Sequence, residues 1–283
     1  MYEQEILHPF HRMAKLYNNP NVESENWRIR TFKISYPKDY YTIFTQGIPA
    51  GTYVSLNCKH PEKFGMDQSC MMSDTPMEKF TNQYVLNYAS GDILIAGLGI
   101  GMLPASLAEK DDVKSITILE LNQEVIDLVE PLIRQNVTNA DKIKIIQADA
   151  YKYPGENPNT KYDWIYLDIW DSFPGSYDDL PMLDNIIEKY IPICPSCRVS
   201  TWGYEFAEAG LEDSPIEVDA YGEYIKELYK HEIELGEQDH DGMHDMLIAT
   251  MQLEDFDVDT DDDIGNENDI DNEVTIDGTT FKI

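Results

Sequence analysis

The chain has 283 residues, of which 42% are hydrophobic, enough to bury the core of one large domain or two small ones. Its 53 acidic and 21 basic residues give a net charge of −32, which repels duplex nucleic acid and anionic membranes and attracts cations. A purely solubilising role for this charge remains an alternative. No apolar run is long enough to span a membrane, and the first residues lack a secretory signal, so we expect a soluble, cytoplasmic protein.

Residues 1–72 are predicted to form an N-terminal segment made of a short helix and several β-strands. The helix is expected within residues 1–20. Three stretches rich in Tyr, Thr, Ile and Val follow, separated by turns that contain Pro or Gly: "WRIRTFKISY", "YYTIFTQG" and "GTYVSLNC". This pattern predicts a small antiparallel β segment before the main domain.

Residues 73–253 are predicted to form the main domain, in which helices and strands alternate. A helix is expected from Pro76, capped by Ser73 or Asp74 and ended by Gly91. Apolar runs separated by helical patterns then read as strands: "DILIAG", "SITILEL", "KIKIIQAD", "YDWIYLD", "CRVSTWGY" and "DMLIATMQ". Such runs predict an α/β, Rossmann-like fold, a mostly parallel sheet with helices on both faces.

Residues 254–283 form an acidic tail that is expected to be flexible. The tail has 12 acidic residues and one Lys, and most of it has too little apolar surface to order itself. Its last stretch, "EVTIDGTTFKI", can form a hairpin around Asp277-Gly278.

A glycine-rich turn joins the first strand of the main domain to the following helix. Gly97, Gly99 and Gly101 form a GxGxG pattern there. Glycine allows unusual backbone conformations and lets a ligand approach the main chain, and the helix start offers N–H groups. The pattern also occurs for packing reasons and in phosphate-binding Rossmann sites, so it does not identify a ligand by itself.

Acidic residues stand at the ends of the next three strands. Glu120 ends the second strand, Asp149 the third and Asp168 the fourth, with Asp171 close behind. The carboxyl ends of parallel strands share one edge of a sheet, so these residues are expected in one crevice. Glu120 is placed to accept both ribose hydroxyls of a nucleoside, and Asp149, next to Ala150, to accept from an adenine amino group. Each acid alone could also cap a helix or face solvent.

The region from about 70 to 205 resembles the class I S-adenosylmethionine-dependent methyltransferases, and within them the polyamine (spermidine) synthase-like branch. Four stretches are similar to the family's successive motifs: "ILIAGLGIG", "ITILELNQEVI", "IIQADA" and "YDWIYLDIWD". Asp168 and Asp171 keep the spacing of the two aspartates found in polyamine synthases. The resemblance implies S-adenosylmethionine, or its decarboxylated form, as cofactor and makes a homodimer plausible. The cofactor-binding residues that it implies are Gly97, Gly99, Gly101, Glu120, Asp149 and Ala150.

The sequence also departs from aminopropyl-transferring enzymes. Ile100 stands where they usually have an Asp, and Ile169-Trp170 stands where they have Ser-Ser. We therefore rank methyl transfer to an unidentified acceptor first, a cationic acceptor being one candidate. The alternative is a spermidine synthase-like aminopropyltransferase, and the second alternative is a non-catalytic nucleoside-binding or scaffold protein.

Asp168 and Asp171 are the predicted catalytic residues. Either could take the proton of an acceptor amine or pair with its ammonium form. Trp170, Phe173 and Tyr177 are predicted to bind the acceptor, because aromatic faces stabilise cations, although Trp170 and Phe173 could equally be core residues. The expected partner is thus a small-molecule or cationic acceptor, with no nucleic acid and no membrane.

Two other patterns are weaker. Cys194 and Cys197 have the CxxC spacing of zinc and redox sites, but ordinary loop thiols are expected because two further zinc ligands are lacking nearby. His240 and His244 are four residues apart, but Gly242 between them favours a loop over a metal-binding helix. No metal site is predicted.

Overall fold

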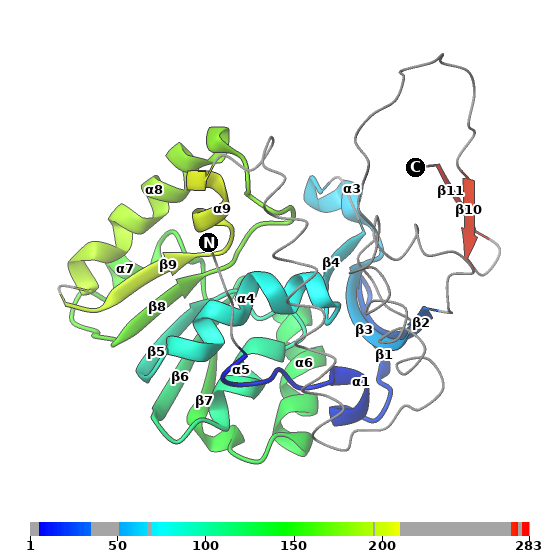
Figure 1. Cartoon of the computed structure of the whole chain (residues 1–283), viewed down its shortest axis with the longest axis horizontal. Coiled ribbons are helices and arrows are strands. Elements are labelled where there is room, and N and C mark those ends of the chain that lie inside the picture. The colour runs from blue at the N-terminus through cyan, green and yellow to red at the C-terminus, as the bar shows by residue number, and fades with distance from the viewer. Residues whose placement is uncertain are drawn as a thin grey trace, which may run out of the picture.

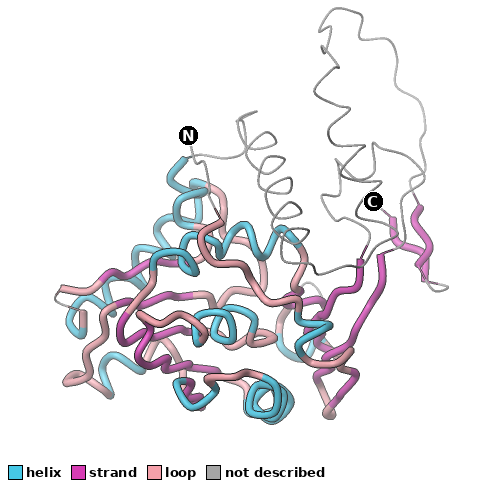
Figure 2. Tube along the Cα trace, turned by 60° about the horizontal axis from the view of Figure 1, so that its bottom comes forward, coloured by secondary structure: helices cyan, strands magenta, loops and turns pink. Residues whose placement is uncertain are grey.

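The computed structural model describes residues 6–34, 51–66, 69–194 and 196–209, and two strands near the end of the chain. These residues form a parallel sheet covered by helices and a smaller antiparallel sheet beside it (Figures 1 and 2). This arrangement confirms the predicted α/β, Rossmann-like fold preceded by a small antiparallel β segment. Within the described part of the chain, no helix has the length and apolar character needed to cross a membrane.

The parallel sheet has the strand order β7-β6-β5-β8-β9. Its strands are β5 (Gly91–Ala96), β6 (Val113–Glu120), β7 (Ile143–Gln147), β8 (Trp164–Leu167) and β9 (Arg198–Thr201). All four neighbouring pairs are parallel. The chain moves outward from β5 first to one side and then to the other. The order therefore reverses between β5 and β8, where open α/β sheets bind their ligands.

Alternate residues of each strand face opposite layers of helices, as the period of two requires. Ile93 and Ile95 of β5 belong to one apolar cluster, and Leu94 and Ala96 belong to another. The first cluster includes residues of α4 (Pro76–Tyr88), α5 (Met102–Ala108) and α6 (Gln123–Asn136). The second includes residues of α7 (Tyr153–Glu156) and α8 (Leu180–Tyr190). Helices thus cover both faces of the sheet, as Figure 1 shows.

The smaller sheet is antiparallel, with the order β1-β2-β3-β4. It consists of β1 (Asn21–Glu23), β2 (Trp27–Ile34), β3 (Gly51–Cys58) and β4 (Cys70–Ser73). The predicted strand at 40–47 lies outside the described residues, and β4 was not expected from the sequence. Because β4 leads directly into α4, it brings the small sheet against the edge of the parallel sheet where the site lies.

The start of α4 differs from the expected capping. The N-cap is Thr75, whose side chain makes no cap hydrogen bond, rather than Ser73 or Asp74. The carboxylate of Asp74 is buried and instead accepts hydrogen bonds from the N–H groups of Met13 (2.9 Å) and Val54 (2.6 Å). Asp74 therefore joins the N-terminal helix α1 (Met13–Leu16) to strand β3, and this tertiary role prevents it from capping α4.

Several shorter elements complete the described chain, most of them not expected from the sequence. They are α3 (Pro61–Phe64), α9 (Tyr204–Ala209), and the 3₁₀ turns η1 (Ala140–Lys142), η2 (Tyr177–Asp179) and η3 (Ile191–Ile193). The predicted C-terminal hairpin is confirmed, since β10 (Glu273–Ile276) pairs antiparallel with β11 (Thr279–Lys282). The predicted helix at 223–235, the predicted strand at 245–252, and His240 and His244 lie outside the described residues.

Cys194 and Cys197 form a disulfide between η3 and β9. The expectation of two ordinary loop thiols is therefore wrong. The chain brings the Cα atoms of the two residues within 5.0 Å of each other, which is a normal separation for a disulfide.

Candidate functional site

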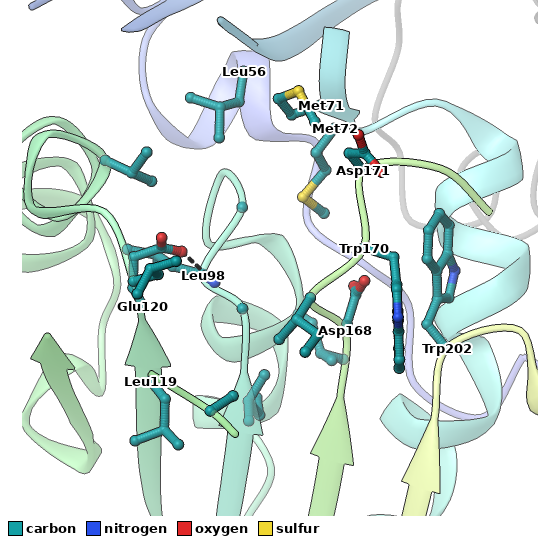
Figure 3. A pocket seen from close by; sticks show the side chains of 18 of the residues that line it. Leu56, Met71, Met72, Leu98, Leu119, Glu120, Asp168, Trp170, Asp171 and Trp202 are labelled. Carbon is teal, nitrogen blue, oxygen red and sulfur yellow. Dashed lines mark hydrogen bonds between the residues drawn. The ribbon is translucent and has the colours of Figure 1, made fainter. Parts of the chain in front are cut away.

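A cavity of about 280 Å³ lies at the point where the strand order reverses. Figure 3 shows it between the carboxyl ends of the parallel strands and side chains of β3 and β4. Leu56, Met71 and Met72 line it from the small sheet. The cavity also collects most of the predicted site residues: Gly97, Gly99, Glu120, Asp149, Ala150, Asp168, Trp170 and Asp171.

The three glycines of the turn have different roles. All three have positive φ, between 52° and 101°, a conformation that other residues adopt at a cost. A Cβ on Gly97 would overlap the carbonyl oxygen of Asp168, and a Cβ on Gly99 would overlap the sulfur of Met72. Gly101 does not line the cavity. A side chain at this position would crowd the core, since a Cβ would lie 2.9 Å from Ile133. Gly97 thus allows β5 and β8 to end close together.

Glu120 holds the glycine turn in place from the end of β6. Its carboxylate accepts hydrogen bonds from the N–H groups of Leu98 (3.1 Å) and Asn122 (2.8 Å). Burial raises the pKa of this carboxyl, and the two hydrogen bonds oppose the rise. Each carboxylate oxygen has a second lone pair, so Glu120 can still accept from ribose hydroxyls in the cavity. Its predicted role in ribose binding remains a prediction.

Asp149 and Ala150 line the cavity at the end of β7, as predicted. The carboxylate of Asp149 forms an ion pair with Lys152 at 2.9 Å and accepts the N–H of Tyr151 at 2.9 Å. The hydrogen bond from Lys152 lowers the pKa of Asp149, so it is an anion at neutral pH. Its expected contact with an adenine amino group remains a prediction.

Asp168 and Asp171 both line the cavity after β8, and a third carboxyl, Glu78, joins them from the first turn of α4. Burial raises the pKa of Asp168 to about 7. Burial and the charge of Asp168 raise the pKa of Glu78 to about 8. Sequence reasoning missed Glu78. The spacing of Thr75 and Glu78 places a carboxylate in a first helical turn, but it does not say that this turn faces the crevice.

The aromatic residues only partly match the predicted wall. Trp170 lines the cavity, and its indole Nε1 is buried with no hydrogen-bond partner among the described residues. Trp202, which was not predicted, also lines the cavity and donates its Nε1–H to Thr81 at 2.8 Å. Phe173 packs edge-on against Trp202 with ring centres 5.0 Å apart, outside the cavity lining. Tyr177 is 70% exposed and does not line the cavity either.

No family model and no curated protein matches this chain. Solved structures that match include a spermidine synthase from Thermotoga maritima, with 15% identity, a TM-score of 0.38, and coverage of 75% of this chain and 62% of that chain. A fibrillarin pre-rRNA processing protein from Methanococcus jannaschii matches with 19% identity, a TM-score of 0.31, and coverage of 49% and 54%. A SAM-dependent methyltransferase from Agrobacterium tumefaciens matches with 16% identity, a TM-score of 0.26, and coverage of 32% and 29%.

In these three matches the alignment covers less than two thirds of the solved chain. With TM-scores below 0.4, the matches say nothing about activity or substrate. What the site can do therefore follows from its own residues.

Proposed function

We propose that this chain transfers an alkyl group from a sulfonium nucleoside of the S-adenosylmethionine type to an amine acceptor. The observation that supports this most is the joint presence of the glycine turn, Glu120, Asp149 and Asp168 in one cavity. Ribose hydroxyls, an adenine amino group and a positive sulfur would each meet a carboxylate there. Trp170 and Trp202 add aromatic faces near Asp168, which suit a cationic acceptor.

The transfer needs one base, and Asp168 is the proposed one. The ammonium form of the acceptor first gives a proton to the carboxylate. The freed nitrogen lone pair then attacks the carbon bonded to the sulfonium sulfur, the C–S electron pair returns to sulfur, and the alkylated amine leaves in its protonated form. A pKa of about 7 leaves roughly half of Asp168 ionised at neutral pH, close to the optimum for a general base. Asp171 and Glu78 are placed to hold the ammonium form of the acceptor before it loses that proton.

The charge of the cavity favours one of the two candidate donors. Glu78, Glu120, Asp149, Asp168 and Asp171 line it, whereas no Lys, Arg or His among the described residues does. S-Adenosylmethionine has a carboxylate that the ionised groups of this lining repel, Asp149 and the ionised fraction of Asp168 among them, while the decarboxylated donor has only positive groups. The charge of the cavity therefore argues against the ranking of methyl transfer before aminopropyl transfer that Ile100 suggested. Ile100 is buried and has no polar side chain to offer a ligand. Aminopropyl transfer is therefore the first candidate and methyl transfer the second.

The products distinguish the two reactions. The purified chain is incubated with either donor and a panel of primary amines that includes putrescine, and the nucleoside products are identified by mass spectrometry. Methylthioadenosine formed from the decarboxylated donor indicates aminopropyl transfer, and S-adenosylhomocysteine formed from S-adenosylmethionine indicates methyl transfer. Asp168→Asn is the control that should lower the rate of formation of either product by about 10²- to 10⁴-fold. Nucleoside binding without any turnover would contradict the proposal in favour of a non-catalytic binding protein.

A further inference from the structure

We propose that Met72 sets the donor specificity of this site by occupying the place on the glycine turn where a donor carboxylate would bind. This inference rests on the proposed function and assigns a role to a residue outside the predicted motifs. Met72 lies on β4, where it pairs with Leu56 of β3, and it lines the cavity. Figure 3 shows its side chain extending toward the glycine turn.

Most N–H groups of the glycine turn, residues 97–101, are already engaged in hydrogen bonds. Gly97 donates to the carbonyl of Leu119 (2.8 Å), Leu98 donates to Glu120 (3.1 Å), and Gly101 donates to the carbonyl of Leu98 (2.9 Å). Three of the five N–H groups of this turn thus serve the fold. The other two belong to Gly99, which has no hydrogen-bond partner among the described residues, and to Ile100.

The N–H of Ile100 donates to the sulfur of Met72 at 3.3 Å. A thioether is a weak acceptor, whereas a carboxylate oxygen would be a strong one. Among the N–H groups of the turn that already have an acceptor, the Ile100 N–H therefore has the weakest one and is the easiest for a ligand to take over. Met72 competes with any donor carboxylate for it.

Met72 also fills the space in front of Gly99. A Cβ at position 99 would overlap the Met72 sulfur, so glycine at this position makes room for the methionine side chain. A donor that has a carboxylate must displace this side chain, while a donor without one can leave it in place. The acidic lining of the cavity acts in the same direction, because it repels a carboxylate and attracts the sulfonium and ammonium groups.

Calorimetric titration of S-adenosylmethionine and of decarboxylated S-adenosylmethionine isolates the carboxylate, because the two ligands differ only in that group. The wild-type chain should bind the decarboxylated ligand more tightly. Met72→Ala should reduce the ratio of the affinity for the decarboxylated ligand to that for S-adenosylmethionine about tenfold. The change should come mainly from tighter binding of S-adenosylmethionine, since the Ile100 N–H becomes available to its carboxylate. Met71→Ala is the matched control, because it removes a neighbouring cavity side chain and should leave the ratio unchanged.

Three results would overturn the inference: a wild-type preference for S-adenosylmethionine, an unchanged ratio in Met72→Ala, or an equal change in Met71→Ala. Each of them leaves the proposed function intact as long as both ligands bind. Absence of binding by either ligand would overturn the proposed function as well. If circular dichroism shows that Met72→Ala does not fold, Met72→Thr repeats the test with a side chain that suits a β-strand.

Discussion

Glu78 and Asp168 bring two desolvated carboxyl groups to one cavity, from the first turn of α4 and the end of β8. The charge of Asp168 raises the pKa of Glu78, so the two groups lie within electrostatic reach of each other. Their pKa values of about 7 and about 8 mean that both change charge close to neutral pH. Binding, turnover and stability should therefore all depend on pH in this range.

Removing the charge of Asp168 should stabilise the fold above neutral pH. Its pKa is raised from 3.8 to about 7, so the unfolded chain ionises first and stability falls as pH rises between these values. This difference in pKa corresponds to a loss of at most about 4 kcal/mol in the free energy of unfolding, and water in the open cavity reduces the loss to on the order of 2 kcal/mol. Urea unfolding of Asp168→Asn should show this gain at pH 8 and almost none at pH 4. An equal gain at both values would contradict the buried-charge account.

Binding of the sulfonium donor should release protons between pH 7 and 8. A positive ligand beside Asp168 and Glu78 favours their ionised forms and so lowers both pKa values. Calorimetric titrations at pH 7.5 in phosphate and in Tris should give different heats, from which the released protons are counted. Asp168→Asn should reduce that count. Identical heats in the two buffers would show that the ligand does not meet these carboxyls.

The rate should fall below about pH 7 because Asp168 becomes protonated there. In Glu78→Gln this acid limb should stay near pH 7, since Glu78 loses its proton only at about pH 8, after Asp168 has ionised. Asp168→Asn should lower kcat by about 10²- to 10⁴-fold above pH 7, and the difference from the wild type should shrink as pH falls below 7. Profiles of kcat between pH 4 and 9 test this, and an acid limb near pH 4 to 5 in the wild type would assign the base to a carboxyl with an ordinary pKa.

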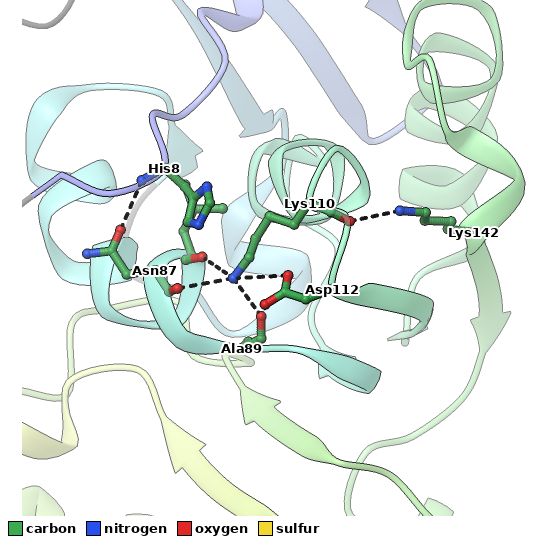
Figure 4. Close-up of polar contacts among 7 residues, drawn as sticks. His8, Asn87, Ala89, Lys110, Asp112 and Lys142 are labelled. Carbon is green, nitrogen blue, oxygen red and sulfur yellow. Dashed lines mark hydrogen bonds and ion pairs between the residues drawn. The ribbon is translucent and has the colours of Figure 1, made fainter.

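Lys110 should be important for stability because its side chain caps the C-terminal end of α4 (Figure 4). Its ammonium group donates to the carbonyls of Leu86 (3.0 Å), Asn87 (3.1 Å) and Ala89 (2.7 Å), and its side chain is 3% exposed. Burial lowers the pKa of Lys110, and nearby Asp112 opposes this. Replacement would leave three carbonyls at the helix end without this donor.

Lys110→Met should therefore destabilise the chain by on the order of 3 kcal/mol in urea unfolding. The matched control is Lys114→Met, because Lys114 is exposed on β6 and should change stability by less than about 0.5 kcal/mol. Equal losses in both variants would mean that the capping contacts of Lys110 contribute nothing specific.

The glycine turn and the acidic strand ends could be predicted from the sequence because each depends on local patterns. An apolar run sets the end of each strand, and parallel strands place their carboxyl ends at one edge. Glu120, Asp149 and Asp168 therefore came together in the cavity as expected.

The residues that reach the cavity from other elements could not be predicted in this way. Met72 lies on a four-residue strand whose existence depends on pairing with β3, the preceding strand, across a connection that includes α3. Glu78 has the sequence context of an ordinary first helical turn, and only the packing of α4 directs it to the crevice. Tyr177 shows the opposite error, because the chain after β8 carries it into η2 and away from the cavity.

Calorimetric titration of the wild-type chain and of Glu120→Ala with methylthioadenosine tests the central claim most directly, namely that this cavity holds the adenosine of a sulfonium donor. Methylthioadenosine has the adenosine and sulfur of the donor but neither its charge nor its amino acid chain. We predict measurable binding to the wild type and a loss of about 10- to 100-fold in Glu120→Ala, because the carboxylate that we propose as the acceptor of the ribose hydroxyls is removed. Equal affinity of both proteins, or no heat and no thermal shift with the wild type, would contradict the account.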